Sequence, residues 1–384
     1  MQLRSLLFPL LFVSIPAAAA QLGAPGDPLS VEMHGFASPG FLVTTGNNYL
    51  AKSKNGSFEF SEIGVNFTKP LTDKLRFGMQ LFARDLGPIG NYNAKFDWFY
   101  LDYRWKDWLG IRAGRVKLPF GLYNEVNDID AARVSVLLPQ SVYPVTSRDF
   151  LLAQTGLELY GRLDLRSLGA LDYHGYLGTV FLDTSTATNG PIAIRDLTTP
   201  YVGGGRLMWE LPVEGLRIGA SAQALRLDTN LAITATNTAF NAKIPAVLWV
   251  GSVEYAAHDL LLAAEYGRWH TKVESSNTAL FPNSSTQSER GYVMAAYRVN
   301  PWLQPGAYYS ILYPDVHKRS GRATQQHDIA ATLRFDINSF WLVKLEGHFM
   351  NGTAALNVPL NNNKPLAQAT QHWGVFLIKS TVYF

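Results

Sequence analysis

The chain has 384 residues, a formal net charge of +3 and no cysteine, and 16% of its residues are charged. Without cysteine it can form no disulfide, no thiolate metal site and no cysteine nucleophile. The net charge is too small to indicate nucleic acid as the main partner, and the charged fraction lies below the about 25% of soluble domains.

Residues 1–20 have the three parts of a secretory signal peptide. Arg4 supplies the positive charge, residues 6–15 form the apolar centre, and the alanines at 18–20 form a small-residue cleavage site. A membrane-spanning helix would need about 20 apolar residues, and this run is shorter and is interrupted by proline. We therefore expect export, removal of residues 1–20, and a single mature domain, residues 21–384.

From Val31 onward the chain consists of segments in which apolar and polar residues alternate, each followed by a turn. In one of them Leu216 and Ile218 fall on one side of an extended chain, and Arg217 and Gly219 fall on the other. A period of two residues is typical of β-strands with two different faces.

Short and long connections between these segments alternate along the chain. The seven short ones lie at 69–73, 106–107, 166–169, 211–214, 257–259, 300–301 and 338–339. The eight long ones lie near 46–57, 87–94, 119–155, 183–200, 229–245, 272–289, 315–325 and 352–370. Together they separate sixteen strands, and an even strand count with short turns on one side and long loops on the other is typical of outer-membrane β-barrels.

A soluble β-sandwich would show the same alternation within each strand, so two further observations decide between the folds. Aromatic residues gather at strand ends beside the short turns, where a membrane interface would lie; they include Trp105, Trp108, Trp209, Trp302 and Trp341. A sandwich with Greek-key crossings also does not require long and short connections to alternate. We predict an all-β fold: a transmembrane antiparallel β-barrel of 16 strands with short periplasmic turns and long extracellular loops.

The third long connection, residues 119–155, has neither a strand nor a helix period. Loops of this length in a compact domain are usually functional, and we predict that this one folds into the barrel lumen and constricts it. In the strand before it, Arg115 and Lys117 share a face and Arg112 lies on the other. We expect Arg115 and Lys117 to line the constriction.

The third loop also carries charges of both signs: Glu125, Asp128, Asp130, Arg133, Arg148 and Asp149. An acidic loop opposite a basic wall would produce a transverse field that orients dipolar solutes. Alternatively, these charges cap turns and anchor the loop through salt bridges. Both interpretations are compatible with the sequence.

Arginine dominates the charges that the alternation assigns to the lumen. The predicted wall residues are Arg76, Arg84, Arg104, Arg162, Arg206, Arg217, Arg298 and Arg334. Rings of Arg and Lys favour anion passage. The alternative is that these arginines pair with nearby carboxylates and leave little selectivity.

Several stretches resemble Gram-negative outer-membrane porins: FTKPLTDKLRFGMQLFARDLG, GRVKLPFGLYNE, and the last strand, HWGVFLIKSTVYF, with its C-terminal Phe384. Within the porins the chain is similar to the phosphate-selective porin O/P and DcaP-like families. The resemblance implies a sixteen-stranded barrel, usually a homotrimer, in which the third loop constricts the pore and small anionic solutes such as dicarboxylates or phosphate are taken up. The dense arginine ladder of the phosphate porins does not occur here as a contiguous motif.

The sequence contains neither H-E-x-x-H nor G-x-S-x-G. We therefore expect no enzymatic activity, no cofactor and no metal site. The expected partners are the lipid bilayer and lipopolysaccharide of the outer membrane and small anionic solutes, with no nucleic acid. The alternative to a porin is an occluded structural or adhesive barrel whose long loops bind a partner.

Overall fold

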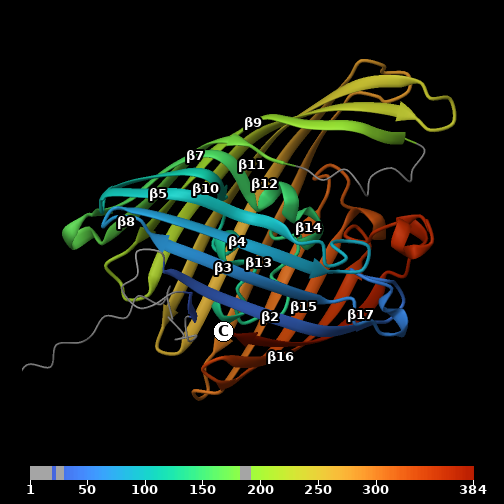
Figure 1. The fold of residues 1–384 in the computed structure, drawn as a ribbon. Coiled ribbons are helices and arrows are strands. Elements are labelled where there is room, and N and C mark those ends of the chain that lie inside the picture. The colour runs from blue at the N-terminus through green and yellow to red at the C-terminus, as the bar shows by residue number, and fades with distance from the viewer. Residues whose placement is uncertain (1–19, 23–29, 182–191) are drawn as a thin grey trace, which may run out of the picture.

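The computed structural model describes residues 20–22, 30–181 and 192–384. Sixteen strands, β2 to β17, form one closed antiparallel sheet (Figure 1). Each strand pairs with the next along the chain, and β17 pairs with β2 to close the ring. The predicted barrel with sixteen strands is confirmed.

The strands have the following bounds: β2 Val31–Thr44, β3 Ser61–Pro70, β4 Leu75–Asp85, β5 Lys95–Lys106, β6 Leu109–Lys117, β7 Ala153–Asp164, β8 Ala170–Thr179, β9 Ile192–Glu210, β10 Leu216–Ile233, β11 Ala239–Ala257, β12 Leu260–Ser275, β13 Ser284–Tyr297, β14 Leu303–Tyr313, β15 Gln326–Asn338, β16 Trp341–Gly352 and β17 His372–Tyr383. Within the described residues, helical structure is confined to single turns: α1 Arg148–Leu151 and the 3-10 turns η1 Ser53–Asn55, η2 Asn124–Val126, η3 Asp130–Ala132, η4 Val145–Ser147, η5 Arg166–Leu168, η6 Arg322–Thr324, η7 Pro359–Asn361 and η8 Leu366–Gln368.

The predicted signal peptide, residues 1–20, lies outside the described residues except for Ala20. That residue begins the short strand β1, Ala20–Leu22, which pairs with the first residues of β2. No helix in the described part of the chain is long and apolar enough to cross a membrane.

The predicted positions of some long connections were wrong, most clearly that of the one at 229–245. Strand β10 continues to Ile233 and β11 begins at Ala239, so only residues 234–238 form the turn. Leu231 and Phe240 pair across this part of the ladder and belong to one small buried cluster. Three of the four threonines of this region lie in the turn, whereas the flanking residues that pair include Leu231, Ile233 and Phe240, whose side chains suit a strand. As a result β10 and β11, together with β9 and β12 that pair with them, extend beyond the other strands of the barrel (Figure 1).

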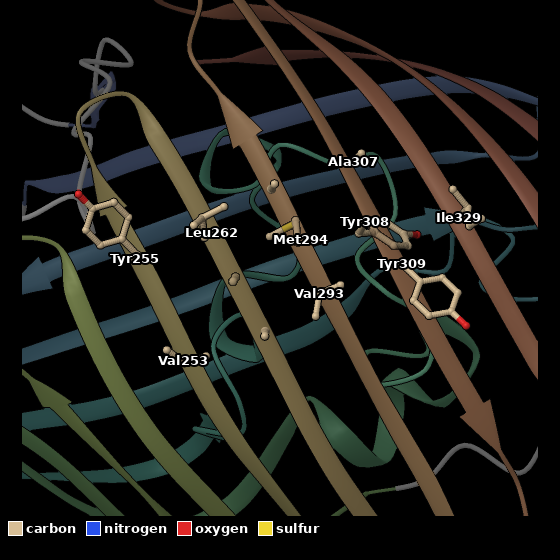
Figure 2. A pocket seen from close by; sticks show the side chains of 12 residues that line it. Val253, Tyr255, Leu262, Val293, Met294, Ala307, Tyr308, Tyr309 and Ile329 are labelled. Carbon is tan, nitrogen blue, oxygen red and sulfur yellow. The ribbon is translucent and has the colours of Figure 1, made fainter.

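Side chains alternate between the two faces of the barrel wall. Figure 2 looks at the outer face of β11–β15, where Val293 and Tyr309 are exposed, whereas Met294 and Tyr308, the next residues along their strands, are buried on the inner face. At the short-turn end the outer face also exposes a set of aromatic residues: Tyr103, Trp105, Trp108, Trp302, Phe340 and Trp341. This distribution matches the predicted interfacial girdle.

The C-terminal residue takes part in closing the barrel. The backbone amide of Phe384 donates to the carbonyl of Gly35 at 3.0 Å, and the amide of Gly35 donates to the carbonyl of Phe384 at 2.7 Å. A Cβ atom at position 35 would lie 2.3 Å from the Phe384 ring. A side chain at position 35 would therefore displace the Phe384 ring, which occupies the space that glycine leaves.

Candidate functional site in the barrel lumen

The third loop, residues 118–152, joins β6 to β7 and lies inside the barrel. Leu118, Phe120 and Leu138 are almost completely buried. Figure 2 shows the teal and green coil of this loop behind β11–β15, on the inner side of the wall. The predicted loop, 119–155, ends three residues too late, because β7 begins at Ala153.

Apolar packing holds much of the loop against the wall. Leu118, Phe120, Leu138 and Tyr143 belong to one buried cluster. Its wall members come from β8–β15: Tyr176, Val202, Met208, Leu225, Leu248, Val250, Ala263, Tyr292, Met294, Tyr308 and Ala330. Burying one large apolar side chain contributes about 1.5–3 kcal/mol, so this cluster stabilises one position of the loop.

A second buried cluster lies nearer the long-loop end. It joins Val136 and Leu137 of the third loop to residues of the first and last long loops, β2, β16 and β17. The wall members on β17 are Trp373, Val375 and Leu377. The third loop thus contacts the wall on two sides of the barrel.

Buried charges fix the middle of the loop to β16 and β17. The carboxylate of Asp130 lies 2.7 Å from Arg133 and 3.1 Å from Lys379, and it accepts a hydrogen bond from Thr381 at 2.7 Å. Burial opposes ionisation of Asp130, but Lys379, Arg133 and Lys344 together hold its pKa well below the usual range. Asp130 and Arg133 are therefore anchoring residues.

Strand β16 binds the backbone of the same segment. The amine of Lys344, fully buried, donates to the carbonyls of Asp130, Arg133 and Ser135 at 2.7, 2.8 and 3.1 Å. The carboxylate of Glu346 accepts hydrogen bonds from the amides of the next two residues, 136 and 137, at 2.7 and 2.8 Å. These contacts satisfy backbone groups that a buried loop would otherwise leave unpaired.

A third ionic contact lies where the loop leaves β6. Asp128 lies 2.5 Å from the amine of Lys117 and accepts a hydrogen bond from Gln80 at 2.7 Å. Arg148 pairs with Asp97 of β5 through two contacts of 2.6 and 3.0 Å. Burial opposes the charge on Asp128, but Lys117 and Arg148 lower its pKa to about 2.

Glu125 keeps contact with solvent, unlike the loop carboxylates Asp128 and Asp130. Its side chain is 27% exposed and lies 2.6 Å from the guanidinium of Arg206 on β9. Burial opposes its ionisation, but the positive charges of Arg206, His174 and Arg112 outweigh this and lower the pKa of Glu125 to about 2. Glu125 on the loop therefore faces a basic wall built by β6, β8 and β9.

Strand β6 presents Arg112 to the lumen. The prediction, which placed Arg115 and Lys117 on the inner face of this strand and Arg112 on the outer face, was wrong. Arg112 lies opposite Asp102 and Glu158 in the ladder and forms ion pairs with both, at 3.5 and 3.0 Å. Glu158 is 1% exposed, whereas its neighbour Leu157 is 57% exposed on the outer face. The prediction was based on Arg115 and Lys117 sharing a face. The inner face of β6 is instead the one that carries Arg112, because Arg112 pairs with carboxylates on the inner face of the two neighbouring strands.

Arg115 and Lys117 do not line the constriction, where the sequence analysis placed them. Arg115 pairs in the ladder with Phe99, which is exposed on the outer face, and its Nε donates to the backbone carbonyl of Asp97 at 2.9 Å. Lys117, at the end of β6, reaches Asp128 and also donates to the carbonyl of Glu125 at 2.9 Å. Lys117 therefore holds the loop rather than lining an open passage.

Most of the predicted wall arginines form ion pairs. Their partners are Asp102 for Arg76, Asp107 for Arg104, Asp172 and Glu210 for Arg162, Glu125 for Arg206, Glu254 for Arg217, and Asp336 for both Arg298 and Arg334. Arg84 donates to the carbonyl of Val145 in the loop at 3.2 Å. Arg334 also donates to the loop, at the carbonyl of Ala131, 2.8 Å away. Pairing offsets much of the positive charge that the arginines bring to the lumen.

Sequence reasoning missed several lumen residues. The predicted site residues did not include Glu158, His174 or Lys379. Glu158 and His174 form a 2.7 Å contact beside Arg112, and Lys379 contacts Asp130. The pattern Leu157, Glu158, Leu159 contained the signal, because two exposed leucines on one face place the glutamate on the other. The described part of the chain contains no group of three or more His, Asp or Glu side chains arranged to hold a metal ion.

Comparison with known proteins found no matching family model and no matching curated protein. Among solved structures, the barrel is similar to OmpT of Vibrio cholerae, with a TM-score of 0.60 at 11% identity over 95% of this chain and 100% of that one. It is also similar to OmpF of Salmonella typhi in complex with daunomycin, with a TM-score of 0.58 at 15% identity over 95% and 100%. An anion-selective porin from Comamonas acidovorans gives a TM-score of 0.56 at 13% identity over 92% and 99%. The chain therefore has the fold of the Gram-negative outer-membrane porins.

Proposed function

We propose that the protein is an outer-membrane porin through which small hydrophilic solutes diffuse, with a modest preference for anions such as dicarboxylates or phosphate. The observation that carries the proposal is the pairing of Glu125, on a loop held across the lumen, with the basic wall formed by Arg112, His174 and Arg206. Charged side chains that line a narrow passage determine which ions and solutes pass through it.

The remaining passage is expected along β4–β9. Inward-facing polar side chains on these strands keep solvent contact, with side-chain exposures of 49% for Arg76, 45% for Arg162 and 18% for Arg112. On the opposite wall, Lys344 and Glu346 are covered by the loop. Solutes would therefore pass between the loop and the strands that carry the arginines.

The preference for anions is expected to be small. Guanidinium groups stay protonated at all physiological pH values, but Glu125, Glu158 and Asp102 balance those nearest the loop. The anion-selective porin among the structural relatives supports the idea that this barrel type can carry such a preference.

Single-channel recording in planar bilayers tests the proposal. Purified protein should give discrete conductance steps, and its reversal potential in a KCl gradient should have the sign of weak anion preference. A protein that inserts without conductance would refute the channel, and a reversal potential of the opposite sign would refute the anion preference alone.

An occluded barrel is the second candidate, because the loop packs into two apolar clusters on different sides of the lumen. In that case the long loops would bind a partner and the wild-type protein would not conduct. A variant that releases the loop, such as Lys344→Met, separates the two: conductance in that variant alone would favour the occluded barrel.

Export through residues 1–20, insertion of residues 21–384 as one domain, and assembly into a homotrimer belong to the same proposal. In-vitro folded OmpT of Vibrio cholerae is described in a trimer form, which supports the last point. The mass of the mature protein tests whether residues 1–20 are removed and residues 21–384 remain as one chain. The mass of its complex in mild detergent tests the homotrimer. Lipopolysaccharide is the expected lipid partner on the long-loop side.

A further inference from the structure

A cavity of about 210 Å³ lies at the long-loop end of the barrel, lined by the third loop, β13 and β14. The first, second and last long loops complete its wall with residues that include Leu50, Ile89 and Leu356. Thr146 and Asn357 also line it and are exposed, so the cavity opens to solvent on the long-loop side. Its volume lies below the about 300 Å³ at which pockets for drug-sized ligands begin, so it suits a small solute.

Arg290 is the only charged side chain among the described residues that line the cavity. It lies on the inner face of β13, two residues before Tyr292, which is buried on the same face. Its Nη1 donates to the backbone carbonyl of Ser141 in the third loop at 2.8 Å, and its Nε donates to the hydroxyl of Ser288 at 3.0 Å. The guanidinium carbon lies 3.5 Å from the centre of the Trp269 ring. These contacts fix the guanidinium group in one orientation.

No carboxylate of a described residue pairs with Arg290. In this it differs from Arg112 and Arg206, which form ion pairs with Glu158 and Glu125. Its Nη2 group makes no hydrogen bond to any residue that the structure describes, and its remaining partners are neutral. A cation that is partly withdrawn from water without an opposite charge is costly, and a carboxylate could offset that cost through two parallel hydrogen bonds to the guanidinium.

The rest of the lining is mostly apolar and is held in place without a ligand. Leu50 and Leu356 belong to the buried cluster that joins the first, third and last long loops, and Ile89 packs against it. The backbone amide of Asn48 donates to the side chain of Asn361 at 2.8 Å, which ties the first long loop to the last. A cavity formed in advance lowers the cost of ordering its walls on binding.

We propose that this cavity is an entry site for small monocarboxylates with an apolar body, such as aromatic carboxylates. The carboxylate would pair with Arg290, and the apolar body would contact the leucine and isoleucine side chains of the long loops. A single unpaired cation in an apolar cavity suits one negative charge, whereas a dicarboxylate would place its second charge against apolar side chains. The inference rests on the proposed function, for which it names a class of solute, but binding at this site does not require conduction.

The test measures binding of benzoate to the purified, full-length mature protein in detergent by saturation-transfer NMR, with protein-free micelles as the baseline. The comparison ligands are benzamide, which has the same ring without the charge, succinate and inorganic phosphate. Saturable binding of benzoate, with each comparison ligand at least about tenfold weaker, supports the proposal. Equal binding of benzamide shows apolar contact alone, and equal binding of succinate or phosphate shows a general anion site; either result overturns it.

Substitutions of Arg290 locate the carboxylate. Arg290→Gln should weaken benzoate binding by about tenfold or more, because charge-assisted hydrogen bonds are lost. Arg290→Lys keeps the charge without the planar fork and should retain part of the affinity. The matched control is Arg268→Gln, which removes a cation from the outer face of the neighbouring strand β12 and should leave binding unchanged. Wild-type affinity in Arg290→Gln overturns the assignment.

A second variant tests the cavity without touching Arg290 or its bond to the third loop. Ala355 lines the cavity from the last long loop, so Ala355→Phe should fill it and abolish benzoate binding. Unchanged binding in this variant overturns the location of the site. Resistance of the folded barrel to unfolding in SDS without heating checks that each variant is native.

Conductance recorded on the same wild-type preparation separates this inference from the proposed function. A barrel that conducts but does not bind benzoate in preference to benzamide refutes the entry site alone. A barrel that binds benzoate but does not conduct refutes the channel alone.

Discussion

Lys344→Met is the most informative perturbation of the third loop. Methionine keeps most of the length and apolar contact of lysine, but it removes the amine that donates to three loop carbonyls at 2.7–3.1 Å. Those carbonyls then stay buried without a donor, and Asp130 loses a cation 3.8 Å away. Removing one partner from a buried ionic network costs about 3–5 kcal/mol.

The loss should appear as local opening of the loop rather than unfolding of the barrel. The amides of Val136 and Leu137, which donate to Glu346, report on this segment. A cost of about 3 kcal/mol corresponds to roughly a hundredfold increase in opening, so hydrogen exchange of these amides should accelerate by about that factor. Trypsin should also begin to cleave after Arg133, which is buried in the native loop.

The control is Lys318→Met, which changes a side chain that is 76% exposed in the seventh long loop. This variant should leave exchange at Val136 and Leu137 unchanged. If Lys344→Met also leaves their exchange at the wild-type rate, the loop is not held by β16, and the argument from the buried amine is refuted.

Three further predictions concern the electrostatics of the lumen. Glu125→Gln removes the loop carboxylate beside Arg206, so reversal potentials in a KCl gradient should shift toward stronger anion preference; a shift the other way would contradict the assigned constriction. Arg112→Gln should shift them toward cations by more than Arg115→Gln does, because Arg112 faces the lumen; equal shifts would argue against that assignment. The pKa of Asp128 is lowered to about 2, so its contribution to holding the loop should be complete above about pH 4 and lost toward pH 2. Exchange of loop amides, corrected for intrinsic rate, should stay constant from pH 7 to 4 and rise below it.

The barrel itself could be predicted because a single local rule repeats along the chain. Period-two alternation and the alternation of short and long connections depend only on neighbouring residues, and together they gave the strand count. The boundaries at 229–245 failed for the same reason. The residues on either side of the turn continue the ladder, although they include Asn230 and Asn241, a residue type that is depleted in strands.

The site was less predictable, because a strand's inner face depends on what the adjacent strands present. Arg112 and Arg115 are separated by an odd number of positions, so only one can point inward. The sequence of β6 alone does not determine which, whereas Asp102 on β5 and Glu158 on β7 do. The contact between Asp130 and Lys379 joins residues far apart in sequence, and it depends on barrel tilt and closure, which no local pattern encodes.

The charges of the third loop divide between two tasks, and this division limits where selectivity can arise. Four of them are buried and ion-paired, so nearby opposite charges largely cancel their electrostatic field in the lumen: Asp128, Asp130, Arg133 and Arg148. A solute passing the loop would meet Glu125 and the arginines of the facing wall instead. Under the proposed function, anchoring and selection would be carried by different residues of one loop, and substitutions at the four anchoring positions should alter the size and noise of the conductance before they alter its ionic preference.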